Sequence, residues 1–363
     1  MKVLLLRALR EPATTASLSL PQWDLLIRQA RHANLLGHLH DLLENATSVP
    51  EVARAHLLAG ARLAERQQQS VRHEAQELAA ALNAVGIRPV LLKGAAYVLA
   101  DLNAARGRVF ADVDLLVPHG QLPQAEAALM LAGWVSGEAD AYNQRYYREW
   151  MHELPPMQHL QRGSVVDVHH TILPPTSRAH PDPAALVANA RALQGWPGLA
   201  VLSSADMVLH SAAHLFHEGE GDNALRDLVD LRSLIAEFLA GDADFWHRLV
   251  EQAHRHHLCE VLALALRYLD RVLGVAVPAA VTHALSPYAG NMARRLLRDQ
   301  MYGRIFTPLH SSTKDLLTPL AREALYIRAH WLRMPPGLLA QHLARKAWMR
   351  VSDAGEPLQA EQP

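Results

Sequence analysis

Residues Val90–Pro118, with the sequence VLLKGAAYVLADLNAARGRVFADVDLLVP, decide how the rest of the chain is organised. The end of this stretch is predicted to be a β-strand that carries Asp112 and Asp114. Because successive side chains of a strand point to opposite faces, the two carboxylates share one face. Their like charges raise each other's pKa unless a cation lies between them. The pair therefore favours a divalent metal site, and its hard oxygen ligands favour Mg²⁺ or Mn²⁺ over zinc.

The first half of the stretch predicts a site for phosphate. Arg88 to Leu92 has the pattern of a short buried strand, and Lys93-Gly94 turns into a helix that ends near Leu102. A glycine at such a turn lets the backbone approach a phosphate, and a helix N-terminus offers N–H groups. Lys93 adds a positive charge, and the planar fork of Arg108 is suited to clamp a phosphate. The turn is not a Walker A loop, because the pattern G-x-x-x-x-G-K is absent.

A second apolar strand, predicted within residues 164–173, contains another acid. Alternation puts Asp167 and His169 on one face of this strand. If the strand pairs beside the first, three carboxylates converge on one point. Such a cluster suits a two-metal phosphoryl or nucleotidyl transfer. The alternative is that these acids only form the solvated face of a half-exposed hairpin.

Three motifs of the sequence resemble those of a known family. The motifs are the run LLKGAA at 91–96, the pattern Arg108-x-x-x-Asp112-Val-Asp114-Leu-Leu-Val, and the later Val-Asp167-Val-His169. The sequence resembles the uncharacterised nucleotidyltransferase family of the polymerase-β-type superfamily over about residues 82–234. The resemblance implies a small mixed sheet with helices. It also implies that the three aspartates ligate metal and that Lys93 and Gly94 lie against a triphosphate.

One position departs from the wider superfamily. The usual turn is Gly-Ser or Gly-Gly, whereas here Ala95 follows Gly94 and the paired acids come later. The family itself has this Lys-Gly form, so the fold expected from the resemblance is unchanged. Activity like that of the well-studied members does not follow automatically, so a catalytically inactive module of the same fold that binds a nucleotide or a partner is a second hypothesis.

Composition indicates an ordinary globular protein. The chain has 363 residues, half of them hydrophobic, and a formal net charge of −1. Nothing in this balance requires a nucleic-acid partner. Cys259 is the single cysteine, so no intrachain disulfide or cysteine-based metal site is expected. With no signal sequence or membrane span evident, a cytoplasmic location is expected.

The expected fold is α+β, with a small nucleotidyltransferase core inside a mainly helical frame. Predicted helices run from Pro21 to Glu44 and from Pro50 through Leu82. The predicted regions are an N-terminal helical region at 1–82, the core at 83–175, a helical bundle at 200–350 and a disordered tail at 352–363. Residues 136–163 are polar and aromatic, and they form either the acceptor pocket or an irregular loop. The basic segment 322–350 is interpreted as a packing helix with a solvated basic face, and the alternatives are that it holds an acidic acceptor or lies on a membrane surface.

A histidine-rich helix is predicted after residue 203. His210, His214 and His217 share one face, which is metal-ligand spacing, but the glutamate of an H-E-x-x-H motif is missing. A His-ligated metal hydrolase is therefore the third hypothesis. We instead predict that His210 or His214 pairs with Asp230 of the next helix and that Arg226 faces the active site. A buried structural His–Asp pair is the alternative.

The sequence thus predicts an enzyme that moves an NMP from an NTP to an acceptor hydroxyl and releases pyrophosphate. Asp112, Asp114 and Asp167 are the predicted catalytic and metal-binding residues, and Lys93, Gly94 and Arg108 the predicted nucleotide-binding residues. His169 and the residues of the two helices just named are predicted to support them. The sequence does not select the acceptor.

Overall fold

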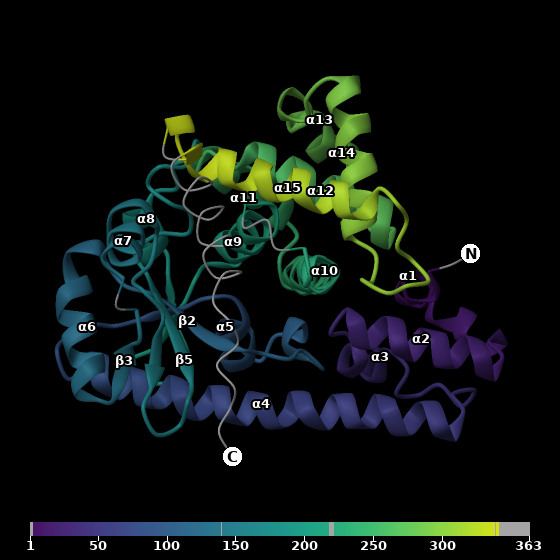
Figure 1. The fold of residues 1–363 in the computed structure, drawn as a ribbon, viewed down its shortest axis with the longest axis horizontal. Coiled ribbons are helices and arrows are strands. Elements are labelled where there is room, and N and C mark those ends of the chain that lie inside the picture. The colour runs from purple at the N-terminus through teal and green to yellow at the C-terminus, as the bar shows by residue number, and fades with distance from the viewer. Residues whose placement is uncertain (1–2, 139, 218–220, 338, 341–363) are drawn as a thin grey trace, which may run out of the picture.

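A computed structural model describes residues 3–138, 140–217, 221–337 and 339–340, and it shows a mixed α/β fold (Figure 1). In this part of the chain the sheet has seven strands in the order β3-β4-β5-β2-β1-β7-β6. The strands are β1 (Val90–Leu91), β2 (Asp112–Leu116), β3 (Trp134–Ser136), β4 (Met157–His159), β5 (Val165–His169), β6 (Arg191–Ala192) and β7 (Ala200–Val201). The sheet therefore continues past residue 175, where the sequence placed the end of the core.

The two acid-bearing strands lie side by side in the middle of the sheet. Strand β2 is antiparallel to β1 and parallel to β5, and the register aligns Asp114 with Asp167. The pairing expected from the sequence is thus confirmed. Alternation along β2 puts Val113 and Leu115 in the main hydrophobic core and Asp112 and Asp114 on the opposite face.

The N-terminal region is helical, as predicted. Its helices are α1 (Leu4–Arg10), the 3₁₀ helix η1 (Pro12–Ser17), α2 (Leu20–His32), α3 (Leu36–Leu42) and α4 (Glu51–Asn83). The prediction of one helix from Pro21 to Glu44 is wrong, because the chain breaks at Asn34, which has a φ of 55°. Asparagine tolerates this left-handed conformation, which ends α2. Helix α4 runs along the sheet (Figure 1).

Short helices connect the strands. They are α5 (Lys93–Leu99), η2 (Asn103–Ala105), η3 (His119–Gln121), α6 (Leu122–Leu131), α7 (Ala141–Arg145), the π-helix η4 (Tyr146–Trp150) and α8 (Pro183–Ala188). The aromatic segment between the acid strands is therefore helical over Ala141–Trp150. It carries Tyr146 and Tyr147 on a π-helical turn, and such turns are frequent at functional sites.

The C-terminal region packs as a group of helices over the sheet (Figure 1). They are α9 (Ser204–His217), α10 (Ala224–Gly241), α11 (Phe245–Arg255), α12 (Cys259–Leu273), α13 (Ala279–Ala284), the 3₁₀ helix η5 (Ser286–Tyr288), α14 (Met292–Ile305) and α15 (Thr318–Arg333). Among the described residues, no helix is long and apolar enough to cross a bilayer. The predicted tail at 352–363 and the last part of the predicted basic helix, from residue 341, lie outside the described residues.

Candidate functional site

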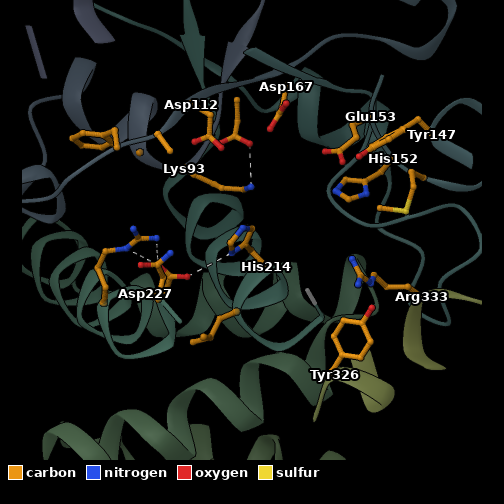
Figure 2. Close-up of a pocket in the computed structure, with 18 of the residues that line it drawn as sticks. Lys93, Asp112, Tyr147, His152, Glu153, Asp167, His214, Asp227, Tyr326 and Arg333 are labelled. Atoms are coloured by element: carbon orange, nitrogen blue, oxygen red, sulfur yellow. Dashed lines mark hydrogen bonds and ion pairs between the residues drawn. The ribbon is translucent and has the colours of Figure 1, made fainter. Parts of the chain in front are cut away.

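A cavity of about 500 Å³ lies where the acid strands face the C-terminal helices (Figure 2). Strands β2 and β5 supply Asp112, Asp114 and Asp167 to its wall. The opposite wall comes from α9, α10 and α15. The cavity therefore brings together all three acids that the sequence singled out.

The three aspartates differ in their electrostatics. Burial alone would raise the pKa of Asp114, but the Lys93 ammonium and the imidazole of His169 hold it well below its usual range. The Lys93 Nζ and His169 Nε2 atoms each lie 3.0 Å from Asp114 Oδ1. Burial and the charge of Asp114 raise the pKa of Asp112. The positive neighbours of Asp114 thus outweigh the effect of burial on its pKa, whereas those of Asp112 do not.

Asp167 has the most perturbed environment of the three. Burial, followed by the charges of Asp114 and Glu153, raises its pKa to about 7. Its Oδ1 atom is buried and has no hydrogen-bond partner within the described part of the chain. A buried carboxylate oxygen without a donor is costly, and a cation would remove the cost. The aspartate site therefore fits a divalent ion with hard oxygen ligands.

Lys93 is held in a strained conformation at the start of α5. Its φ of 41° lies in the left-handed region, which costs of order 1–3 kcal/mol for a side chain other than glycine. The strain is compatible with the hydrogen bond from Nζ to Asp114, which fixes the ammonium at the cavity wall.

Gly94 is required for close packing. A Cβ atom at this position would lie 2.5 Å from Phe110 Cδ1 and would also collide with the Arg108 guanidinium. The Arg108 side chain lies over the Phe110 ring, with its Cζ atom 4.9 Å from the ring centroid. The small residue that the sequence placed against a phosphate thus also makes room for these two side chains.

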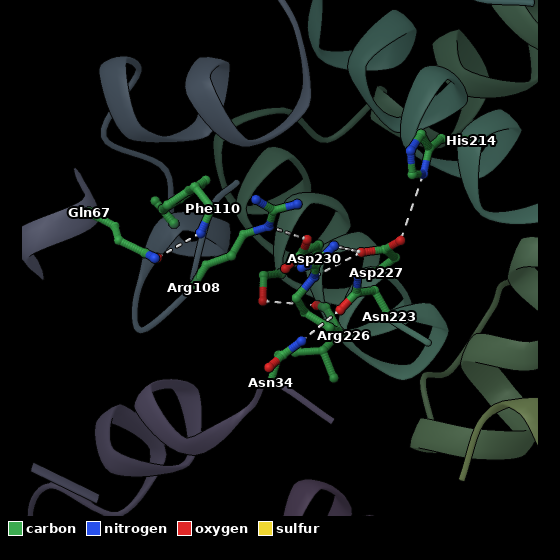
Figure 3. Close-up of polar contacts among 12 residues, drawn as sticks. Asn34, Gln67, Arg108, Phe110, His214, Asn223, Arg226, Asp227 and Asp230 are labelled. Carbon is green, nitrogen blue, oxygen red and sulfur yellow. Dashed lines mark hydrogen bonds and ion pairs between the residues drawn. The ribbon is translucent and has the colours of Figure 1, made fainter. Parts of the chain in front are cut away.

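The Arg108 side chain, which comes from the segment before β2, contacts a buried group of polar residues on α10 (Figure 3). Its Nε donates a hydrogen bond of 2.7 Å to Asp230, and both side chains are buried. On the next turn Arg226 donates to Asp227 with Nε and Nη2, and Asp227 Oδ2 lies 3.7 Å from His214 Nδ1. The predicted pairing of His210 or His214 with Asp230 is therefore wrong, because Arg108 takes Asp230. Arg226 does line the cavity.

The histidines of α9 do not form a common metal site within the described residues. His214 lines the cavity, while His210 and His217 are buried in the helix packing. Burial, with a contribution from the Lys93 charge, holds the pKa of His210 well below its usual range. Burial also lowers the pKa of His217 to about 4. This arrangement gives no support to the His-ligated hydrolase hypothesis.

Sequence reasoning missed part of the cavity wall. Tyr326, His330 and Arg333 of α15 line it, and their spacing of four and three residues puts them on one helix face. That spacing was the available signal, but the segment was interpreted as a packing helix. Glu153 and Tyr147 also line the cavity (Figure 2); they lie in the segment 136–163, which the sequence offered as an acceptor pocket, and Glu153 was not named there.

The end of α15 is fixed to the loop after β5. Thr176 Oγ1 donates a 2.5 Å hydrogen bond to the carbonyl of Arg333, and Ser177 Oγ donates one of 3.2 Å to the carbonyl of Leu332. The side chain of Arg333 is itself buried. The cavity thus has a fixed positive group on the side away from Lys93 (Figure 2).

Comparison with known proteins agrees with the sequence analysis. The profile of a family described as "Uncharacterised nucleotidyltransferase" matches residues 19–274. The chain belongs to this uncharacterised nucleotidyltransferase family. No curated protein and no solved structure matches it. Membership supports a nucleotide-transferring activity with an NTP substrate, and the matched region contains both acid strands but ends before α15.

Proposed function

We propose that the protein is a metal-dependent nucleotidyltransferase that moves an NMP from an NTP to an acceptor hydroxyl. The observation that carries the proposal is the alignment of Asp112 and Asp114 on β2 with Asp167 on β5, facing a cavity that Lys93 also lines. A small mixed sheet of this kind, with acids on adjacent parallel strands, supports a polymerase-β-type core. The acceptor stays unnamed.

The three aspartates would hold Mg²⁺ or Mn²⁺. Burial and the charge of Asp114 raise the pKa values of Asp112 and Asp167, and the buried Oδ1 of Asp167 has no hydrogen-bond partner within the described part of the chain. When bound, divalent ions at such carboxylates neutralise phosphate charge and orient the attacking and leaving oxygens. The rest of the reaction depends on the side chains around them.

The cavity has two sides, and we assign the nucleotide to one of them. Lys93, Arg108 and Arg226 gather on the side of α5 and α10, where they would neutralise the triphosphate. Their ion pairs with Asp114, Asp230 and Asp227 fix the positions of the cations in advance. Preorganised charges stabilise a transition state without a cost of reorganisation.

The acceptor would then lie on the other side, near Asp167, Tyr147 and Arg333. In the reaction the acceptor hydroxyl oxygen forms a bond to the α-phosphorus, and the bond from that phosphorus to the bridging oxygen breaks to release pyrophosphate. Asp167 would complete the second metal site on this side and so favour loss of the hydroxyl proton.

The test avoids the unknown acceptor. Each NTP is titrated with and without Mg²⁺ into the wild-type protein and into a double variant carrying Asp112→Asn and Asp114→Asn, and thermal unfolding is followed. Saturation near a hundred times Kd should stabilise the native state by about 2.7 kcal/mol. The proposal requires a Mg²⁺-dependent stabilisation that the double variant lacks. If no NTP stabilises the folded wild-type protein, the proposal fails.

One observation favours a second candidate, a module that binds a nucleotide or a partner without turnover. Arg108 and Phe110 cover Gly94, the residue expected to approach the phosphate. The two candidates differ in pyrophosphate release. NTP binding without any release of pyrophosphate in single-turnover reactions with a panel of hydroxyl acceptors would favour the module, whereas release that depends on Asp167 would exclude it.

A further inference from the structure

His152, Glu153 and His169 form a compact group on the Asp167 side of the cavity. Their ligand atoms, the imidazole nitrogens and a carboxylate oxygen, all lie within 4.8 Å of one another. Glu153 Oε2 lies 3.3 Å from His169 Nδ1, and the centroids of the two imidazole rings are 5.0 Å apart. Figure 2 shows His152 and Glu153 at the cavity wall.

The backbone holds this group rigidly. Glu153 forms a β-bridge with His169 at the end of β5, so the two side chains emerge on the same face. The amide of Leu154 donates to the carbonyl of Val168 over 2.9 Å, and the amide of His170 donates to the carbonyl of His152 over 2.8 Å. The bridge and these two hydrogen bonds thus tie the segment that carries His152 and Glu153 to the end of β5, which favours a fixed geometry.

The two nitrogens of His169 have different surroundings. Its Nε2 lies 3.0 Å from Asp114 Oδ1, whereas its buried Nδ1 has no hydrogen bond within the described residues. The side chain is 1% exposed, so Nδ1 is shielded from bulk solvent. A carboxylate on one imidazole nitrogen commonly orients a histidine whose other nitrogen binds a metal. Here that second nitrogen faces Glu153.

We propose that His152, Glu153 and His169 bind a first-row transition-metal ion of the Zn²⁺ class. Two imidazole nitrogens and one carboxylate oxygen suit zinc and its neighbours, whereas Mg²⁺ prefers a set of oxygens such as the three aspartates. Glu153 and His152 line the cavity, so the ion has a coordination position toward the space assigned to the acceptor. An open position of this kind is typical of zinc sites that bind a substrate or water.

The inference goes beyond the proposed nucleotide transfer and does not depend on it. The transition-metal site and the aspartate site share the His169 imidazole as a bridge to Asp114. The two sites are distinguished by their ligand chemistry, because imidazole nitrogens favour transition metals and carboxylate oxygens favour Mg²⁺.

The experiment uses the full chain, stripped with a chelator and reloaded with Zn²⁺ or Co²⁺ in the absence of nucleotide. Bound zinc is counted by elemental analysis, affinity is measured by calorimetry, and Co²⁺ is followed by its visible absorption. Glu153→Gln and His152→Gln remove one ligand each. His180→Gln, at an exposed histidine, is the matched control. Asp112→Asn tests the aspartate site separately, and circular dichroism checks the fold of every variant.

We expect one equivalent of zinc and a Co²⁺ spectrum in the wild-type protein, the control and Asp112→Asn. Affinity should fall at least about tenfold in both ligand variants. The absence of stoichiometric zinc binding to the folded wild-type protein would overturn the inference. It would also be overturned if Asp112→Asn lost the ion while Glu153→Gln kept it, because the ion would then belong to the aspartates. Failure of NTP binding leaves these readouts unaffected.

Discussion

Replacing Asp167 by asparagine should stabilise the metal-free protein at pH 8 and much less at pH 5. Folding raises the pKa of this carboxyl from 3.8 to about 7. Below pH 3.8 the side chain is protonated in both the folded and the unfolded state, so the raised pKa has no effect on stability. As the pH rises toward 7, the unfolded state releases the proton more readily, and the free energy of unfolding falls.

The magnitude follows from the size of the shift. Three pKa units at ~1.4 kcal/mol each give a cost of about 4 kcal/mol when Asp167 is fully ionised. The side chain keeps partial contact with solvent, so we expect to measure about half of this, roughly 2 kcal/mol, at pH 8. Asparagine has the same shape but never ionises, and therefore removes this cost.

Urea unfolding in the presence of a chelator, at pH 5 and pH 8, measures the difference in the free energy of unfolding between the wild-type protein and the Asp167→Asn variant. The matched control is Asp270→Asn, which changes an exposed carboxylate on α12 and should alter stability by no more than about 0.5 kcal/mol. Added Mg²⁺ should stabilise the wild-type protein at pH 8 more than the Asp167→Asn variant. The reasoning is refuted if Asp167→Asn has the same effect at both pH values, or if it destabilises the protein at pH 8.

Three further predictions concern stability, each measured by chemical denaturation. Gly94→Ala should destabilise the fold by about 1–3 kcal/mol, because the new Cβ collides with Arg108 and its neighbours. Gly120→Ala is the control, because a Cβ at that position lies in open space. Equal stabilities of the two variants would contradict the packing at Gly94. Asp230→Asn should cost about 3–5 kcal/mol by leaving the Arg108 guanidinium buried without its partner carboxylate, and a neutral result would show that the pair is solvated. Trp134→Ala should cost about 3–5 kcal/mol because this side chain is buried in the core, and a loss below about 1 kcal/mol would show that the site collapses.

The sequence by itself determined the local elements that carry the acids. Alternating apolar residues fix Asp112 and Asp114 on one face of a strand and Asp167 on a second strand. The long helix α4 also follows from its composition, which is rich in good helix formers. These features depend on neighbours a few residues apart, and that is why the sequence alone was enough for them.

Only the tertiary structure decided which distant groups meet. Arg108 and Asp230 are 122 residues apart, and their pairing depends on how α10 packs over the start of β2. The pattern of histidines on α9 gave the right helix face but the wrong partner, because Asp227 and Asp230 are one helical turn apart and either is within reach of the neighbouring helix.

The same holds for the walls of the cavity. Arg333 lines the cavity because the end of α15 is hydrogen-bonded to the loop after β5, and no local sequence pattern predicts that contact. Glu153 joins His169 through a β-bridge rather than through sequence spacing. Periodicity thus determined the acids and their strands. The ion-pair partners of Arg108 and the grouping of Glu153 with His169 depend on long-range packing, which local spacing does not encode.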